Sequence, residues 1–203
     1  TQNVAANSSA PGLPDSVPGN NAQASADVPS ANPDANLPAP APVAVSKDLI
    51  WVKSDVLNFA IDPNGGDIVQ LNLPEYPRRQ DMPNIPFQLF DNGGERTYLA
   101  QSGLTGTNGP DARSSGSPLY SATQKSYQLA DGQNQLVVDL KFSDNGVNYI
   151  KRFSLDRGEY DLKVSYLIDN QSAQAWNGNL FAQLKRDDSS DTSSSTATGT
   201  ATY

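Results

Sequence analysis

Apolar and polar side chains alternate along two neighbouring segments in the first half of the chain. Apolar residues fill every second position there: Leu57, Phe59 and Ile61 in the first segment, and Val69, Leu71 and Leu73 in the second. Alternation with a period of two predicts β-strands that have one apolar and one polar face. Residues 62–67, between the two segments, read Asp-Pro-Asn-Gly-Gly-Asp. Because proline presets φ and glycine accepts a positive φ, this sequence predicts a turn that pairs the two strands as a hairpin.

The same alternation recurs through the rest of the chain. Further strands are predicted at 86–90, 96–101, 126–130, 135–143, 147–155, 162–168 and 180–184. Asp144-Asn145-Gly146 gives the strongest hairpin signal, and Lys151 interrupts the apolar face of the strand that follows it. Residues 73–77 are expected to form a rigid exit loop, and 102–118 a long loop of the kind that often carries function. Because no segment shows a 3.6-residue apolar period, the pattern predicts an all-β, antiparallel sandwich.

Composition divides the chain at about residue 46. Residues 1–46 are rich in Ala, Pro, Ser and Asn and contain no Lys or Arg. Such a segment is expected to be a disordered linker that reaches roughly 40 Å. Residues 47–203 have a globular composition and predict one domain large enough to bury a core. The polar tail from 187 to 203 contains no predicted strand or helix, so the domain is expected to be incomplete at its C-terminus. Neither a transmembrane helix nor a signal peptide is predicted in this chain.

The charge of the chain and its missing residue types exclude several classes of function. There are 22 acidic and 14 basic residues, a formal net charge of −8, and neither histidine nor cysteine. An acidic chain without a basic cluster is not expected to bind nucleic acid or an anionic membrane surface. The doublets Arg78-Arg79 and Lys151-Arg152 are interpreted as solvated charges at strand edges. Without Cys and His, the chain has no thiol nucleophile, no Ser-His-Asp triad, no Cys/His zinc site and no His- or Cys-ligated haem.

Acidic residues supply two candidate cation sites. Residues 62–67 resemble a calcium loop only weakly, because the alternating ligands and the Glu at the twelfth position of an EF-hand loop are missing. A turn is the simpler interpretation. Asp187, Asp188 and Asp191 could gather a hard cation, but a solvated loop is the favoured interpretation. No metal-binding residue is therefore assigned.

Two carboxylate pairs are candidates for acid–base chemistry, Asp67 with Glu75 and Asp156 with Glu159. Nothing in the sequence makes either pair converge, and almost any β domain contains such pairs. No catalytic residue is assigned, and the chain is not expected to be an enzyme.

Aromatic residues and glycines supply the remaining candidates. Trp51, Trp176 and several tyrosines could form a sugar-stacking platform, although packing is the default role of such residues. The glycines at 93–94, 103, 106, 109 and 116 are expected in loops, without the strand–helix context of a nucleotide site. No cofactor-binding residue is assigned, and no cofactor is expected.

Short motifs in a fixed order carry a resemblance to a known family. They fall at residues 54–57 (SDVL), 65–67 (GGD), 73–77 (LPEYP), 86–89 (PFQL), 100–106 (AQSGLTG), 108–111 (NGPD), 118–120 (PLY), 129–136 (LADGQNQL) and 181–185 (FAQLK). The ordered set resembles the large periplasmic domain of the YidC family of bacterial inner-membrane protein insertases. The AQSGLTG segment followed by NGPD is its most unusual part, and the similarity extends from about residue 47 to the last residue.

The resemblance implies a fold, a place and a role. The fold is a β-supersandwich of the galactose-mutarotase kind, and the place is the periplasmic face of the inner membrane, behind a linker and a transmembrane anchor outside this chain. The role is that of a non-catalytic accessory domain of an insertase, which assists insertion and folding of inner-membrane proteins alone or with the Sec translocon. Its partners would be translocon components and nascent membrane proteins. The family's groove arginine and Sec-contact region have no counterpart here, so no site residue is carried over.

A second hypothesis comes from the aromatic residues and the linker. It is an independent, secreted carbohydrate-binding β-sandwich. The histidine-based chemistry of mutarotases is excluded, because the chain contains no histidine. A soluble hydrolase is a third and weaker possibility, for want of a convergent catalytic set.

Overall fold

Ten strands and one short 3-10 turn make up the regular structure of the described residues. The computed structural model describes residues 48–93 and 96–187. The strands are β1 (Ile50–Lys53), β2 (Asn58–Asp62), β3 (Asp67–Arg79), β4 (Met82–Phe90), β5 (Tyr98–Thr105), β6 (Ser126–Gln128), β7 (Gln135–Asp144), β8 (Val147–Asp156), β9 (Leu162–Asn170) and β10 (Asn179–Arg186), and the 3-10 turn is η1 (Pro110–Ala112). The predicted linker 1–46 and the tail beyond 187 lie outside the described residues. Within the described part, no helix is long and apolar enough to cross a membrane.

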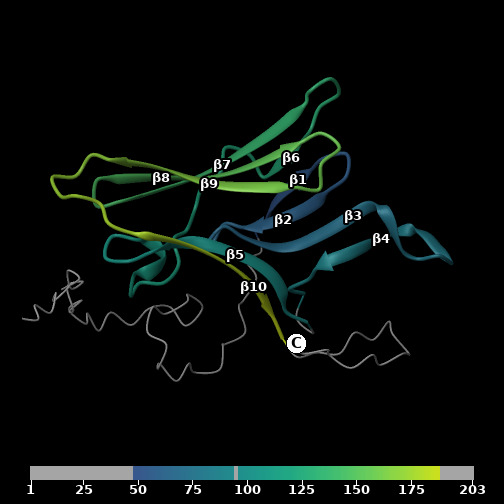
Figure 1. The fold of residues 1–203 in the computed structure, drawn as a ribbon, viewed down its shortest axis with the longest axis horizontal. Coiled ribbons are helices and arrows are strands. Elements are labelled where there is room, and N and C mark those ends of the chain that lie inside the picture. The colour runs from purple at the N-terminus through teal and green to yellow at the C-terminus, as the bar shows by residue number, and fades with distance from the viewer. Residues whose placement is uncertain (1–47, 94–95, 188–203) are drawn as a thin grey trace, which may run out of the picture.

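The strands form two sheets that face each other (Figure 1). The larger sheet runs in the order β10-β5-β3-β2-β1-β6, with β4 paired to β3, and the smaller sheet is β7-β8-β9. All pairings are antiparallel except the one between β1 and β6. The predicted all-β fold class is therefore confirmed.

The core lies between the two sheets, where the alternating apolar positions meet. Phe59 and Ile61 of β2 are fully buried, as are Val138 and Leu140 of the facing strand β7. Along β8 every second residue is buried, starting at Val147. Full burial of one such apolar side chain is worth about 1.5–3 kcal/mol. The period-two pattern in the sequence therefore does specify which face of each strand enters the core.

The prediction of a loop at 73–77 is wrong, because β3 continues through these residues to Arg79 and pairs with β4. The prolines did not stop the strand, since among the described residues β4 pairs only with β3 and the register shifts between Leu73 and Pro77. Edge strands and bulges are the positions where a sheet tolerates residues without an N–H. Strand β5 likewise begins at Tyr98 rather than 96 and runs to Thr105, into the predicted long loop.

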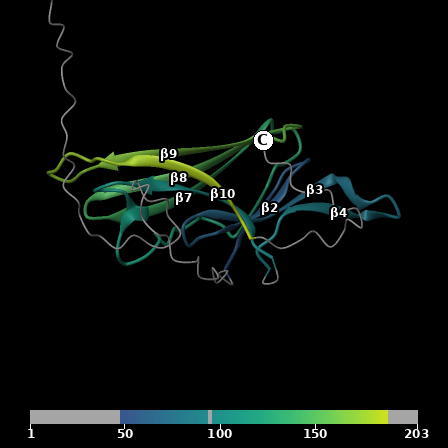
Figure 2. The same ribbon diagram turned by 60° about the horizontal axis from the view of Figure 1, so that its bottom comes forward.

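The outer halves of β3 and β4 form an arm, residues 74–89, that reaches beyond the two layers (Figure 2). Its exposed large apolar side chains are Tyr76, Met82, Ile85, Phe87 and Leu89. Tyr160, from the β8–β9 turn, packs edge-on against Tyr76 and donates a hydrogen bond of 2.9 Å to Glu75. Monomeric proteins seldom expose so many apolar residues in one place unless another surface covers them. The arm is therefore a candidate contact surface.

Lys151 is the charged residue that departs most from its predicted environment. The solvated interpretation of this residue is wrong, because its side chain is 0% exposed between the two sheets. Its Nζ donates hydrogen bonds to the Gly65 carbonyl at 3.0 Å and to the Ser102 carbonyl at 2.6 Å. A Cβ at Gly66 would lie 2.9 Å from the Lys151 Cδ, so glycine makes room for the lysine stem. One cation thus links β8 of the small sheet to two segments of the large sheet.

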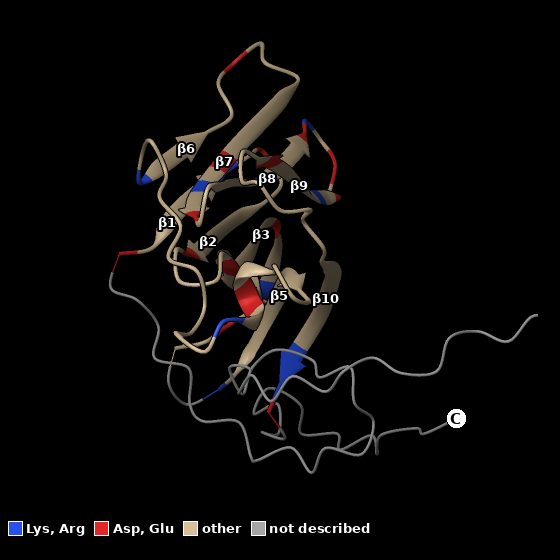
Figure 3. Ribbon diagram, turned by 90° about the vertical axis from the view of Figure 1, so that its left-hand side faces the viewer, with Lys and Arg blue, Asp and Glu red and all other residues tan. Residues whose placement is uncertain are grey.

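The other three residues of the two basic doublets reach solvent, as predicted. Arg152 forms a two-pronged pair with Asp139, with both N–O distances at 2.7 Å. Arg78 and Arg79 are exposed on the arm. Figure 3 shows Lys and Arg positions interspersed with Asp and Glu positions along the described ribbon.

Candidate functional site

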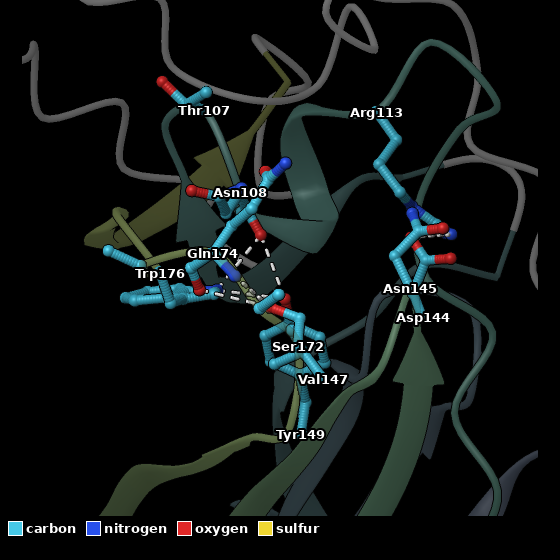
Figure 4. A pocket seen from close by; sticks show the side chains of 13 residues that line it. Thr107, Asn108, Arg113, Asp144, Asn145, Val147, Tyr149, Ser172, Gln174 and Trp176 are labelled. Carbon is cyan, nitrogen blue, oxygen red and sulfur yellow. Dashed lines mark hydrogen bonds and ion pairs between the residues drawn. The ribbon is translucent and has the colours of Figure 1, made fainter.

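A polar pocket opens at one end of the sandwich, where three connections meet (Figure 4). They are the loop around η1, the β7–β8 turn and the loop between β9 and β10. The cavity has a volume of about 540 Å³. This size falls in the usual range for small-molecule sites.

Asn108 joins two of these connections to β8. Its backbone carbonyl accepts hydrogen bonds from the Tyr149 hydroxyl at 3.0 Å and from Trp176 Nε1 at 3.2 Å. Its side-chain Oδ1 accepts another from the Asn177 backbone N–H at 3.0 Å. Trp176 Nε1 also lies 3.0 Å from the Tyr149 hydroxyl, which accepts from it. The floor of the pocket is therefore a connected network that fixes both rings.

Two glycines allow the backbone to pack closely around this network. A Cβ at Gly109 would lie 2.2 Å from the Leu104 carbonyl oxygen, which is backbone and cannot move aside. A Cβ at Gly178 would lie 2.4 Å from the six-membered ring of Trp176. The Asn-Gly steps at 108–109 and 177–178 thus combine a hydrogen-bonding residue with one that leaves room for a neighbour.

Arg113 and Asp144 form the opposite wall of the pocket. Arg113 Nε donates to the Pro110 carbonyl at 2.9 Å, and the guanidinium lies 4.6 Å from the centre of the Phe142 ring. Its Nη1 is 3.5 Å from Asp144 Oδ2. The two charges offset each other, so the wall is polar but close to neutral.

The groups in the pocket favour binding over chemistry. Burial raises the pKa of the Tyr149 hydroxyl, while the hydrogen bond from Trp176 acts in the opposite direction. The phenol therefore stays protonated near neutral pH. Asp144 is the one carboxylate among the residues that line the pocket, and it faces Arg113. The arrangement is suited to hold a polar ligand by hydrogen bonds.

A second cavity is an apolar groove between the edges of the two sheets. Its volume is about 610 Å³, and its walls include Leu162 and Val164 of β9 and Ala182 and Leu184 of β10. Within the described residues, β9 and β10 each pair on one side only. The groove therefore lies beside two strands with an open hydrogen-bonding edge.

The candidate cation positions take structural roles. Asp62 caps the predicted turn, because its Oδ1 accepts a hydrogen bond of 2.9 Å from the Asn64 backbone N–H. Asp67 accepts one of 2.7 Å from Gln101 Nε2. Asp187 pairs with Thr97, both through its backbone N–H and through its carboxylate. Asp188 and Asp191 lie outside the described residues.

The structure separates one carboxylate pair and brings the other together. Asp67 and Glu75 lie eight residues apart on β3, which is about 26 Å along a strand. Asp156 and Glu159 line one shallow depression at the β8–β9 turn. Hydrogen bonds from Lys163 and Gln135 lower the pKa of Asp156, which makes it a poorer base.

Of the two tryptophans, only Trp176 lines the pocket. Trp51 is 48% exposed on β1 and is not among the residues around either cavity. Among the glycines, Gly109 shapes the pocket, whereas Gly103 lies inside β5 rather than in a loop. Sequence reasoning did not identify Asn108, Arg113 or Tyr149. The unusual length of the predicted loop 102–118 was the signal that pointed to this region.

Comparisons with known proteins find relatives along the whole chain. The family model described as the YidC periplasmic domain matches residues 49–203. The chain is 80% identical over 203 residues to a protein of Pseudomonas putida named membrane protein insertase YidC. Proteins of the same name from Pseudomonas fluorescens and Pseudomonas syringae are 74% and 71% identical. All of this chain is covered, but it spans only 36% to 37% of the length of these relatives.

Proposed function

Because this chain belongs to the family of YidC periplasmic domains, we propose that it is the accessory part of a membrane protein insertase. The proposed role is to dock partners near the site of insertion, while the insertion step belongs to other segments of the protein. The family match over residues 49–203 is the observation that carries this proposal.

The location follows from the same premise. We propose that the domain stands on the periplasmic face of the inner membrane and is anchored by segments outside this chain. Residues 1–46 would serve as the spacer and 47–203 as part of the folded domain. A spacer of this composition reaches roughly 40 Å, which allows the domain to stand away from its anchor.

The shape of the domain supports a docking role. The arm presents Tyr76, Met82 and Ile85 to solvent, and the apolar groove lies beside two strand edges. Exposed apolar surface and open strand edges are features that protein partners use. The proposed partners are components of the Sec translocon and nascent membrane proteins. Similar proteins are named insertases, which favours this role over an independent, secreted carbohydrate-binding module.

Excision of residues 55–203 from the full-length protein is expected to abolish docking of the translocon. The translocon that co-purifies with the full-length protein in mild detergent should fall to background in the excised variant. A matched control shortens only the spacer, by removing residues 5–40, and should retain the translocon. Equal recovery of the translocon with all three proteins would show that this domain does not dock it.

A further inference from the structure

The polar pocket contains hydrogen-bonding groups that the described structure leaves unused. The side chains of Thr107, Asn145 and Gln174 line the pocket and make no hydrogen bond within residues 48–93 and 96–187. The Nδ2 of Asn108 makes none in the same part of the chain, although its Oδ1 is bonded to Asn177. Three amides and one hydroxyl therefore offer both donors and acceptors at one place.

The pocket also has a rigid aromatic side. Trp176 is held through its Nε1 by Asn108 and Tyr149, and it packs edge-on against Tyr149 with 6.4 Å between ring centres. Its six-membered ring rests on Gly178. An indole fixed in this way offers apolar contact at little cost in side-chain entropy.

The charge of the pocket limits the class of ligand. Arg113 and Asp144 are the charged side chains in the lining, and they face each other at 3.5 Å. An anion would lie near Asp144, and a cation near Arg113. The site is therefore matched to a neutral ligand.

We propose that this pocket binds a neutral, hydroxyl-rich ligand of the saccharide class. Sugar hydroxyls both donate and accept hydrogen bonds, which matches the amides of Asn108, Asn145 and Gln174. The C–H faces of a sugar ring match an apolar indole surface such as that of Trp176. A volume of about 540 Å³ is sufficient for a mono- or disaccharide. This inference is independent of the docking role proposed above.

An extended peptide fits the pocket less well. Peptides commonly bind by adding a strand to an open sheet edge. The walls of the pocket are turns and loops, and β8 is paired on both sides at this end. The open edges of β9 and β10 lie along the apolar groove instead. The observations therefore favour a saccharide.

Tryptophan fluorescence can report directly on this site. The Trp51→Phe variant leaves Trp176 as the single tryptophan, and Trp51 is an exposed residue outside the pocket. The variant chain is titrated with maltose, cellobiose and N,N′-diacetylchitobiose, with trialanine as the peptide probe. At least one disaccharide is expected to give a saturable change in Trp176 emission at millimolar concentration, and trialanine none.

Two further variants test the residues named above. Gln174→Ala removes an exposed amide, and Asn145→Gly removes a second one while tolerating the positive φ of 48° at that position. Together they are expected to weaken binding about tenfold, because each hydrogen bond contributes several-fold to affinity. Gln124→Ala, an exposed amide outside the pocket, is the matched control and should bind as the parent does. The proposal is overturned if no disaccharide gives a saturable change with the folded chain. It is equally overturned if the double variant binds as tightly as the parent, or if trialanine alone binds.

Discussion

Replacing Lys151 with methionine is expected to lower the free energy of unfolding by about 1–3 kcal/mol, because two buried carbonyls lose their donor while the cost of burying a charge is removed. Methionine preserves most of the apolar stem, so the change acts mainly on charge and hydrogen bonds. The carbonyls of Gly65 and Ser102 lose the donor that holds both of them. Burial raises the pKa of the Asp111 carboxyl, which also loses in Lys151 a nearby cation that acts in the opposite direction.

The substitution also has a stabilising effect, because it removes the cost of burying the Lys151 charge. Burial lowers the pKa of Lys151 to about 8, although Asp67 and Asp111 act in the opposite direction. The surroundings therefore compensate the charge only in part. The loss still dominates, because a buried carbonyl without a donor costs about 1–3 kcal/mol and two such groups remain.

Urea unfolding at pH 7, followed by circular dichroism, measures this effect. Lys141→Met is the matched control, because Lys141 is exposed on the neighbouring strand β7. It should change stability by no more than about 0.5 kcal/mol. If Lys151→Met were as stable as Lys141→Met, the link between the sheets would contribute nothing.

Raising the pH from about 7.5 to about 10 is expected to stabilise the domain by about 2–3 kcal/mol through Lys151 alone. The pKa of this lysine is about 8 in the folded chain, against 10.5 for an unperturbed lysine. Between these values the unfolded chain binds more protons than the folded chain. The free energy of unfolding therefore increases with pH in this window.

The buried Tyr120 and the partly buried Tyr166 reverse the trend above about pH 10. Burial raises the pKa of Tyr120 and of Tyr166 above the ordinary value of 10.0, and the carboxylates of Asp67 and Asp111 act in the same direction. Above that value the unfolded chain loses these protons while the folded chain keeps them, so stability falls. Stability should thus pass through a maximum near pH 10.

Urea midpoints across this pH range provide the measurement. The rise between about pH 8 and 10 should vanish in Lys151→Met and persist in Lys141→Met. A flat profile in the unmodified chain, or the same rise in both variants, would show that Lys151 is not the group responsible.

Strand positions and the core could be predicted from the sequence because alternation is a local signal. Phe59 and Ile61, or Val138 and Leu140, specify an inward face without reference to the rest of the chain. The arm could not be predicted, because the prolines at 74 and 77 argue against a strand. Their tolerance depends on β4, which within the described part of the chain pairs only with β3. That pairing is a tertiary contact, which the local sequence pattern does not reveal.

The environment of Lys151 and the pocket depended on contacts between distant segments. Lys151 lies at an inward position of β8, but a charged residue at that position interrupts the alternation of apolar and polar residues and therefore does not predict burial. Its acceptors come from residues 86 and 49 positions away. The pocket likewise joins Asn108 to Trp176, 68 residues apart. Of this site the sequence indicated Trp176, Gly109 and a long loop.

Insertion by the full-length protein without residues 55–203 tests the accessory role most directly. The variant is produced in cells depleted of their own insertase, and membrane integration of a single-span substrate is followed by protease protection. Integration is expected to stay close to that of the unmodified protein at equal expression, because the proposed accessory role leaves the insertion step to other segments. Loss of integration despite normal levels of the variant in the membrane would contradict it, and would place residues 55–203 in the insertion step itself.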